Sequence, residues 1–529
     1  MREESGYDTI IRNGKVVDGT GRPAFKADVG LSNGRIGAVG NLSTANARKE
    51  IDASGKVVCP GFIDTHTHSD LLLLYDRQHA NALQQGVTTE ILGQDGMSYA
   101  PLSRSKLEMY YKYLAGVNGA PPVPLDWSSV WEFRDRFDGT VAINTAYQVP
   151  HGTLRLETLG FKNVPLEADA LGRAKDMLRT GIAEGAVAMS TGLSYFPGAY
   201  SDTEELVELS KVLKEEDSVY VTHLRTVFKG EPFDAVSEAL EIARRSGCRL
   251  HFSHFRTGPH NAGRVGELMR QIDEAASDGV DLTLELYPYS FGSSTGLIHL
   301  PPWAVEGGCE KALSRLRDPG LRQALVEGIE ANTLPLDGVF THLPSRNNDE
   351  LLGKTFGQAA EMRGKSKAEV LIDLLVEEEL AVGICGVPAD SAKVRERLER
   401  DYLELLSRPY YMVGSDSILL GDNPHPRAFG TFPKLLRLCR EHQFSLETMI
   451  NRMTKVPART FRLSDRGEIA EGKAADVVVF DPAEVRDTAT IESSRSAPTG
   501  ITHVWVNGVH ALSNEKVTGR FGGSALPQR

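Results

Sequence analysis

The feature that most constrains the fold is a succession of eight short apolar segments, separated by longer segments, between residues 61 and 414. Alternating strands and helices predict an α/β protein, and eight such repeats predict a (β/α)8 TIM barrel. The interval between residues 291 and 408 is too long for one barrel helix, so we expect an insertion over the barrel mouth at about residues 291–355. The expected strands are residues 61–67, 87–92, 141–148, 186–190, 219–223, 249–254, 280–286 and 411–414, with helices between most of them, for example at 168–184, 203–216 and 234–246.

The two ends of the chain carry a different pattern, in which short apolar strands are separated by turn dipeptides. Asn13-Gly14, Asp18-Gly19, Asn33-Gly34 and Asn507-Gly508 each lie beside an apolar segment. Asn-Gly or Asp-Gly between apolar strands is a strong hairpin signal. We therefore expect residues 1–59 and 461–529 to build one small β-sandwich domain beside a barrel of residues 60–460. The last segment, residues 522–529, is expected to be mobile.

Composition and charge argue against several classes of protein. The 529 residues carry a formal net charge of -12, and there is no basic run with interleaved aromatic residues of the kind that binds nucleic acid. No apolar run approaches the length of a membrane span, and the first residues lack the apolar centre of a signal peptide. The five cysteines are scattered without Cys-x-x-Cys spacing, which suits a reducing compartment. We expect a cytoplasmic protein that acts on a small molecule, as a monomer or homo-oligomer.

The first barrel strand ends in a pair of histidines that could bind a metal ion. His66 and His68 are two residues apart, and such side chains leave the same face of a strand. His223, His254 and Asp416 close or follow the fifth, sixth and eighth expected strands. The carboxyl ends of barrel strands carry the chemistry of barrel enzymes. Four histidines and an aspartate at one mouth therefore indicate a metal site.

Short motifs spread over most of the chain carry a resemblance to a known family. They are Pro-Gly-Phe-Ile-Asp-Thr-His-Thr-His at 60–68, Glu-Gly-Ala at 184–186, Ser-Thr-Gly-Leu-Ser-Tyr-Phe-Pro-Gly at 190–198, Thr-His-Leu-Arg at 222–225, Ser-His at 253–254, Tyr-Pro-Tyr at 287–289, Gly-Ser-Asp at 414–416 and His-Pro-Arg-Ala-Phe-Gly at 425–430. Through these motifs the chain resembles the amidohydrolase superfamily and, within it, the N-acyl-D-amino-acid deacylases, or D-aminoacylases. That branch uses no carboxylated lysine between its metal ions, and the fourth expected strand here has no lysine.

The resemblance implies a zinc-dependent hydrolase of linear amide bonds with one or two metal ions. By motif match, His66 and His68 would bind one metal position, and His223 and His254 the other. Asp416 would be a metal ligand and the general acid/base. A metal-bound hydroxide would attack the amide carbon, while Asp416 takes the proton of that water and delivers it to the departing amine.

One position departs from the family pattern. The family usually has a bridging cysteine in Gly-Asn-Cys-Gly at the end of the second strand, whereas this chain has Gly93-Gln94-Asp95-Gly96. The flanking glycines and the strand end suit a close approach to a metal, so we expect Asp95 to be a ligand rather than a structural residue. A carboxylate is a harder ligand than a thiolate, which admits Mn2+ or Co2+ besides Zn2+.

The substrate that the resemblance implies is an N-acyl-D-amino acid, split to a carboxylate and a free D-amino acid. Its carboxylate needs cationic or hydroxyl partners, and the candidates are Arg427, Tyr287, Ser293 and Arg256. Three alternatives stay open: a hydrolase of D-dipeptides, a cyclic-amide hydrolase of the dihydroorotase or hydantoinase type, and a barrel that has lost its metal and serves as a scaffold.

Overall fold

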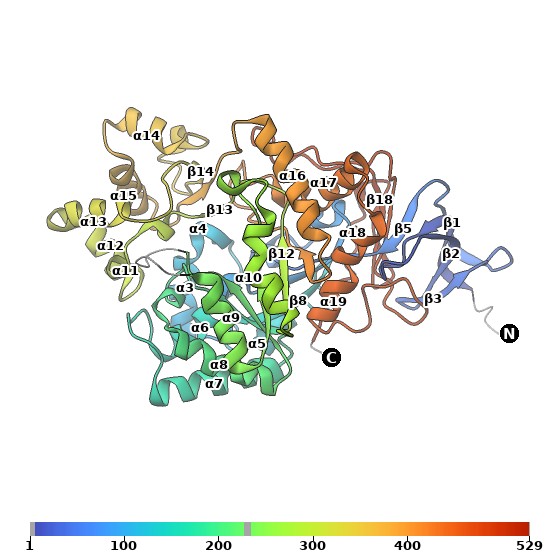
Figure 1. Ribbon diagram of the computed structural model, residues 1–529, viewed down its shortest axis with the longest axis horizontal. Coiled ribbons are helices and arrows are strands. Elements are labelled where there is room, and N and C mark those ends of the chain that lie inside the picture. Colours follow the sequence, from blue (N-terminus) through green and yellow to red (C-terminus); the bar gives the residue numbers. More distant parts are fainter. Residues whose placement is uncertain (1–5, 227–233, 528–529) are drawn as a thin grey trace.

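The structure is a computed structural model that describes residues 6–226 and 234–527. Its central element is an eight-stranded parallel sheet that curls into a barrel (Figure 1). The segments that follow the two end strands are joined by backbone hydrogen bonds, such as Asp416 N to His66 O (2.8 Å) and His68 N to Ser417 O (2.9 Å). The predicted α/β barrel is therefore confirmed. Its strands are β6 (Phe62–Asp64), β7 (Val87–Leu92), β8 (Asn144–Pro150), β9 (Ala188–Gly192), β10 (Val219–His223), β11 (Arg249–Phe252), β12 (Leu282–Leu286) and β16 (Tyr411–Val413).

Several helices around the barrel begin with a side-chain cap that precedes an apolar stripe. In α8 (Thr203–Glu215), the side chain of Asp202 accepts a hydrogen bond from Glu205 N (2.8 Å). Leu206, Leu209 and Leu213 of α8 are buried, and this spacing of three or four residues places them on one helix face. None of the helices in the described ranges is long and apolar enough to span a membrane. Other outer helices are α7 (Ala168–Ala183), α9 (Ala235–Ser246), α10 (Val265–Ser277), α16 (Ala392–Leu406), α17 (Arg427–His442) and α18 (Leu446–Met453).

Both chain ends contribute to one separate mixed sheet, as predicted. Strand β5 lies between β1 and β17, so it joins the N-terminal strands to the C-terminal ones. Val58, Val477 and Trp505 belong to the buried cluster of this sheet. In Figure 1 the sheet lies at one end of the long axis, away from the barrel mouth. Its strands are β1 (Tyr7–Val16), β2 (Phe25–Ser32), β3 (Arg35–Gly40), β4 (Ala47–Asp52), β5 (Val57–Pro60), β17 (Val477–Phe480), β18 (Ile501–Val506), β19 (Val509–Ser513) and β20 (Lys516–Val517).

The turn dipeptides have different outcomes. Asn33-Gly34 connects β2 to β3, and Asn507-Gly508 connects β18 to β19, as hairpin turns should. The prediction of a hairpin at Asn13-Gly14 is wrong, because β1 continues through it with a shift of register against β2. Asn13 has a φ of 60°, and its backbone N–H donates to Asp28 Oδ1 at 2.9 Å. A β-bulge and a tight turn both use left-handed residues, so the dipeptide cannot distinguish them.

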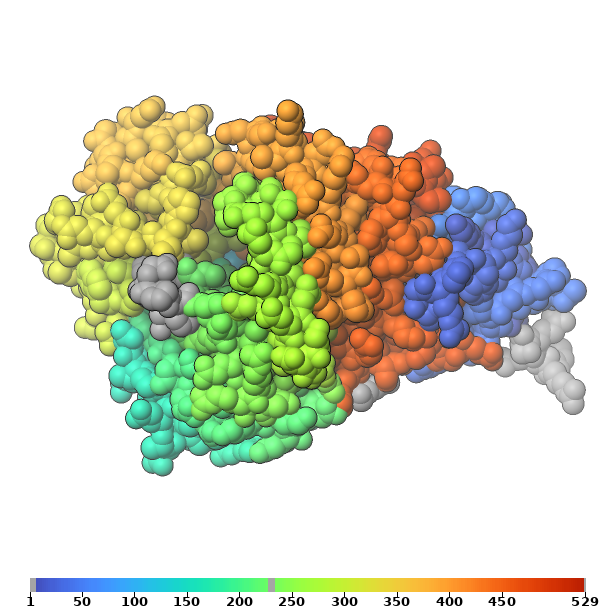
Figure 2. All heavy atoms as spheres, in the orientation of Figure 1, coloured from blue at the N-terminus to red at the C-terminus, as the bar shows by residue number. Residues whose placement is uncertain are grey.

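A small insertion stands between β12 and β16. It contains β13 (Ser293–Thr295), β14 (Val339–His342) and β15 (Gly383–Cys385), paired in the order β13-β15-β14. The region expected to form the insertion, residues 291–355, includes the first two of these strands. Figures 1 and 2 show this part (yellow) as a lobe at the opposite end of the molecule from the mixed sheet. Its helices are α11 (Pro302–Val305), α12 (Cys309–Arg317), α13 (Arg322–Glu330), α14 (Phe356–Arg363) and α15 (Lys367–Glu377).

The C-terminal segment is ordered against the barrel, so the prediction of a mobile tail is wrong for residues 522–527. Thr145 N of β8 donates to Ser524 O (3.0 Å), and Leu526 N donates to Thr145 O (2.7 Å). Leu526 is 6% exposed and packs in a cluster with Ile63 and Phe461. The segment therefore closes the end of the barrel opposite the mouth.

Candidate metal centre

The six expected metal ligands lie together at the carboxyl ends of the barrel strands. Two groups of potential ligand atoms are found among the described residues, and within each group the atoms lie within 4.8 Å of one another. Asp95 belongs to both groups, which makes it a candidate bridge between two metal ions. The first group is His66, His68 and Asp95, and the second is Asp95, His223 and His254.

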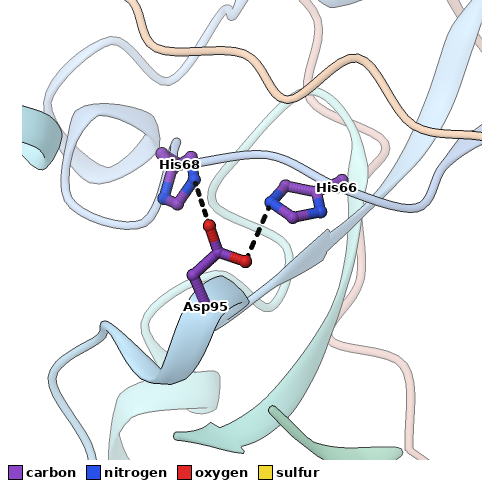
Figure 3. A group of neighbouring side chains, drawn as sticks. All are labelled: His66, His68 and Asp95. Carbon is purple, nitrogen blue, oxygen red and sulfur yellow. Dashed lines mark ion pairs between the residues drawn. The ribbon is translucent and has the colours of Figure 1, made fainter. Parts of the chain in front are cut away.

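The carboxylate of Asp95 lies between the two pairs of histidines. Its Oδ1 lies 3.5 Å from His66 Nε2, and its Oδ2 lies 3.7 Å from His68 Nε2. Figure 3 shows both imidazoles pointing toward this carboxylate. On the other side, Asp95 Oδ2 lies 3.5 Å from His223 Nδ1 and 3.8 Å from His254 Nε2. Asp416 Oδ1 adjoins the first pair, 3.8 Å from His66 Nε2 and 3.5 Å from His68 Nε2.

Three of these residues have left-handed backbone conformations. The φ angles are 54° at Asp95, 36° at His254 and 53° at Asp416, a region that costs non-glycine residues of order 1–3 kcal/mol. Asp95 is also held by close packing, because a Cβ on Gly192 would lie 2.1 Å from Asp95 O. Strain at three clustered residues is typical of a functional site.

The orientation of His66 is fixed by Glu285, which the sequence analysis missed. Glu285 Oε1 lies 2.5 Å from His66 Nδ1, so the opposite nitrogen, Nε2, faces Asp95. The same carboxylate accepts a hydrogen bond from the Thr65 hydroxyl and lies 3.2 Å from His251 Nε2. In the sequence, the feature that could have indicated a role for Glu285 is its place as a charged residue within the largely apolar strand Leu-Thr-Leu-Glu-Leu.

The centre concentrates negative charge in a buried place. Burial opposes ionisation of Asp95, but the charges of His66 and His223 outweigh it and hold the pKa of Asp95 well below its usual range. For Asp416, burial is likewise outweighed, first by Arg427, so its pKa is lowered. The pKa of Glu285 is lowered against the effect of burial by His66 and His251. The histidines and Arg427 thus supply the positive charge that keeps these three buried carboxylates ionised.

A divalent cation fits this donor set. His66 Nε2 and Asp95 Oδ1 are buried and have no hydrogen-bond partner, although buried polar atoms are nearly always paired. Imidazole and carboxylate are the ligands that zinc takes in catalytic sites. The residues present therefore match a binuclear metal site of His66, His68, Asp95, His223 and His254.

The residues expected to bind the substrate carboxylate lie beside Asp416, around the ring of Tyr287. The guanidinium of Arg427 lies 4.5 Å from the Tyr287 ring centre, and that of Arg256 lies 4.1 Å from it. Arg427 is fully buried, and its Nη1 lies 2.8 Å from Asp416 Oδ2. Nη1 therefore has Asp416 as its charged partner, whereas Nε of Arg427 has no hydrogen-bond partner. Ser293 lies next to Arg427 but its hydroxyl donates to Ile384 O (2.9 Å).

A cavity of about 270 Å3 joins these residues to the candidate ligands. His68, Asp95, Asp416, Tyr287 and Arg427 all line it, whereas Arg256 is not among the lining residues. Sequence reasoning missed Tyr195, another lining residue, whose hydroxyl lies 3.0 Å from Ser294 Oγ. The Ser-Thr-Gly-Leu-Ser-Tyr motif at residues 190–195 contains Tyr195, but the motif alone does not indicate a role for this side chain.

Comparisons with known proteins point to one family. The chain matches the Amidohydrolase family over residues 49–511. It is 33% identical to a D-aminoacylase of Alcaligenes xylosoxydans xylosoxydans, over 98% of this chain and 97% of that protein. An N-acyl-D-glutamate deacylase of the same organism is 32% identical over 95% of this chain and 93% of that protein. The structure of N-acyl-D-glutamate deacylase from Bordetella bronchiseptica, with zinc and a phosphonate mimic of the tetrahedral intermediate, superimposes with a TM-score of 0.82 at 32% identity and covers 99% of this chain and 100% of its own.

Proposed function

The chain belongs to the amidohydrolase family as a metal-dependent relative of the D-aminoacylases, and we propose that it hydrolyses N-acyl-D-amino acids to a carboxylate and a free D-amino acid. The observation that carries this proposal is the placement of Asp416. Its Oδ1 faces the candidate ligands His66 and His68, and its Oδ2 faces Arg427. One carboxylate thus lies between a metal centre and a cation suited to a substrate carboxylate.

His66, His68, Asp95, His223, His254 and Asp416 would hold one or two Zn2+ ions, or Mn2+ or Co2+ because of the hard carboxylate of Asp95. A divalent ion here supplies a nucleophilic water at neutral pH and polarises the amide carbonyl. The chemistry of this chain's own residues centres on Asp416. Its ionised carboxylate accepts a proton from the attacking water as the new C–O bond forms, and returns that proton to the nitrogen as the C–N bond breaks. Without this proton the amine is a poor leaving group.

Arg427 binds the α-carboxylate of the substrate in this proposal. Its Nε has no hydrogen-bond partner, and the planar guanidinium, already paired with Asp416 through Nη1, would offer its remaining N–H donors to a carboxylate. Tyr287 lies between Arg427 and Arg256 and keeps both guanidinium groups in place through its ring. Ser293 would have to exchange its hydrogen bond to Ile384 O for one to the carboxylate, and Arg256 contributes positive charge from behind the ring.

The test combines metal analysis with a substrate panel. Purified protein is analysed for bound metal, before and after addition of Zn2+, Mn2+ or Co2+. The metal-loaded protein is then assayed on matched N-acetyl-D- and N-acetyl-L-amino acids, on D-dipeptides and on cyclic amides of the hydantoin type. Bound metal with selective release of D-amino acids supports the proposal. Bound metal with activity on cyclic amides alone overturns the substrate, and protein that takes up no metal overturns the mechanism as well.

A further inference from the structure

The cavity at the metal centre changes character along its length. At the barrel end it is lined by the candidate ligands, and at the other end by residues of the insertion and its neighbours, most of which are apolar. The whole cavity has a volume of about 270 Å3, so a small N-acyl amino acid would fill much of it. The apolar lining residues are Val117, Ile298, Leu334, Pro335, Phe356, Ile384 and Ile418.

Among the described residues that line this cavity, one carries a permanent positive charge, and Arg256 lies behind the lining residue Tyr287. Arg427 is the one lysine or arginine among the described residues that line it. The acidic lining residues among those described are Asp95 and Asp416, and both already face histidines of the metal centre. A substrate whose α-carboxylate is bound by Arg427 would therefore find no second fixed charge of either sign in this lining.

His299 does not change that charge balance. It lies in the insertion end of the cavity and is 3% exposed. Burial lowers the pKa of His299 to about 4, so its ring is neutral at neutral pH. Its Nδ1 atom has no hydrogen-bond partner. In the free protein His299 is thus uncharged, and it can form a hydrogen bond with a polar group of a substrate.

On the basis of the function proposed above, we propose that the α-carboxylate is the only charge the enzyme accepts on its substrate. Both the side chain and the acyl group must then be uncharged. The physical reason is that an ion moved from water into a buried site without a partner loses its hydration and gains nothing in return. This conclusion does not depend on which of the two groups enters the insertion end, because the described lining residues offer no free charge at either end.

Matched substrates isolate charge from size. N-acetyl-D-glutamate and N-acetyl-D-glutamine differ in charge but hardly in shape. N-succinyl-D-leucine and N-succinamoyl-D-leucine, in which the succinyl carboxylate is a primary amide, make the same comparison for the acyl group. With the metal-loaded full-length protein, we expect kcat/KM to be higher for the neutral member of each pair by roughly 100-fold or more. N-acetyl-D-glutamate hydrolysed within tenfold of its neutral partner would overturn the specificity proposal but leave the deacylase function intact. Failure to hydrolyse any panel member would overturn both.

A charge inserted into the wall provides the converse test. Leu334 lines the cavity and is half-buried, so a longer cationic side chain can extend from this position. Leu334→Lys should raise the ratio of kcat/KM for N-acetyl-D-glutamate over N-acetyl-D-glutamine by roughly tenfold or more. Leu334→Met, similar in length but neutral, should leave this ratio near that of the unmodified protein. An unchanged ratio in a folded Leu334→Lys protein would contradict the proposal.

Discussion

Asp416 is the residue on which the proposed reaction depends most. It is 6% exposed and lies beside both His68 and Arg427. Asp416→Asn keeps the shape of the side chain but removes its ability to accept a proton, so kcat should fall by roughly 10² to 10⁴. The measurement is single-turnover hydrolysis with parallel metal analysis. Retention of metal with full activity would remove Asp416 from the role of general acid/base.

Glu285 should act on the metal centre through His66. The negative charge of Glu285 favours a proton on His66 Nδ1, and this tautomer leaves Nε2 free to bind a metal. Glu285→Gln removes that charge, and partners that orient a metal ligand in this way typically contribute 10-fold to 100-fold in metal affinity. We expect the dissociation constant for Zn2+ to rise by roughly this factor, as measured by competition with a chelator. Glu378→Gln is the control, since Glu378 is also buried but bonds Ser345 and Asn348. Equal losses in both variants would indicate a general effect on folding.

Asp95 should set the preference among metals. Because thiolate favours Zn2+ more than carboxylate does, Asp95→Cys should raise the ratio of Zn2+ to Mn2+ affinity by at least roughly tenfold. Titration of the metal-free protein with each ion measures this ratio, and Asp95→Ala shows the effect of losing the ligand altogether. An Asp95→Cys ratio equal to that of the unmodified protein would mean that residue 95 is not a ligand.

The sequence could predict the candidate ligands because each stands at or near a strand end, where topology alone brings side chains together. His66 and Asp416 lie two and three residues beyond the ends of the first and last barrel strands, β6 and β16. They are far apart in the sequence, but the order of the strands was sufficient to predict that they meet. Glu285 and Tyr195 were missed for a different reason. A single glutamate in a strand, or a tyrosine in a loop, has no spacing that reveals which side chain it will meet.

At the scale of elements, most strands and helices were predictable to within a few residues. Strands β7 and β10 match their expected ranges, and α8 ends one residue before its expected limit. Hydrophobic periodicity and caps are local properties, so sequence reports them well. The Asn13-Gly14 prediction was wrong because the choice between bulge and hairpin depended on Asp28, a residue on a neighbouring strand.

The contact between α6 (His151–Thr158) and α8 should make stability depend on pH. Glu205 of α8 is 1% exposed, lies 2.7 Å from His151 Nε2 and accepts a hydrogen bond from Arg155. Burial opposes its ionisation, but the charges and hydrogen bonds of His151 and Arg155 lower the pKa of Glu205 to about 2. A carboxyl group whose pKa is lower in the folded chain than in the unfolded chain stabilises the folded state at pH values above the pKa of the unfolded chain. This stabilisation is lost as the pH falls from about 4.5 to about 2.

Glu205→Gln should therefore lower the free energy of unfolding by about 3 kcal/mol at pH 7. The difference from the unmodified protein should shrink as the pH approaches 2, because the carboxyl group is then protonated in both folded and unfolded chains. Urea unfolding of both proteins at several pH values measures this difference in the free energy of unfolding. Glu204→Gln removes an exposed partner of Arg245 on the same helix and should change stability by less than about 1 kcal/mol. A difference that does not vary with pH would contradict the assigned pKa.

At the scale of the whole molecule, the joining of the two chain ends was predictable, but the fate of the last residues was not. The alternation of apolar strands near both ends indicated a shared β-domain. Residues 522–527 contain glycine, serine and proline, a composition expected of a mobile end. Their order comes from backbone bonds to Thr145, and backbone bonding leaves no signature in the side chains.

The C-terminal segment should therefore stabilise the barrel from the end opposite its mouth. Leu526 packs against Ile63, Val219 and Phe461 in one buried cluster, and Leu526→Ala should cost about 2–4 kcal/mol. A chain that ends at Gly522 should lose more, because the hydrogen bonds between Thr145 and the segment are lost as well. Phe521→Ala is the matched control, since Phe521 is 40% exposed and its loss should change stability by roughly 0.5 kcal/mol or less. If denaturant unfolding of the shortened chain matched that of the full chain, the segment would be mobile in solution after all. A loss of stability with metal affinity preserved would instead show that this end of the barrel supports folding, while the mouth supports chemistry.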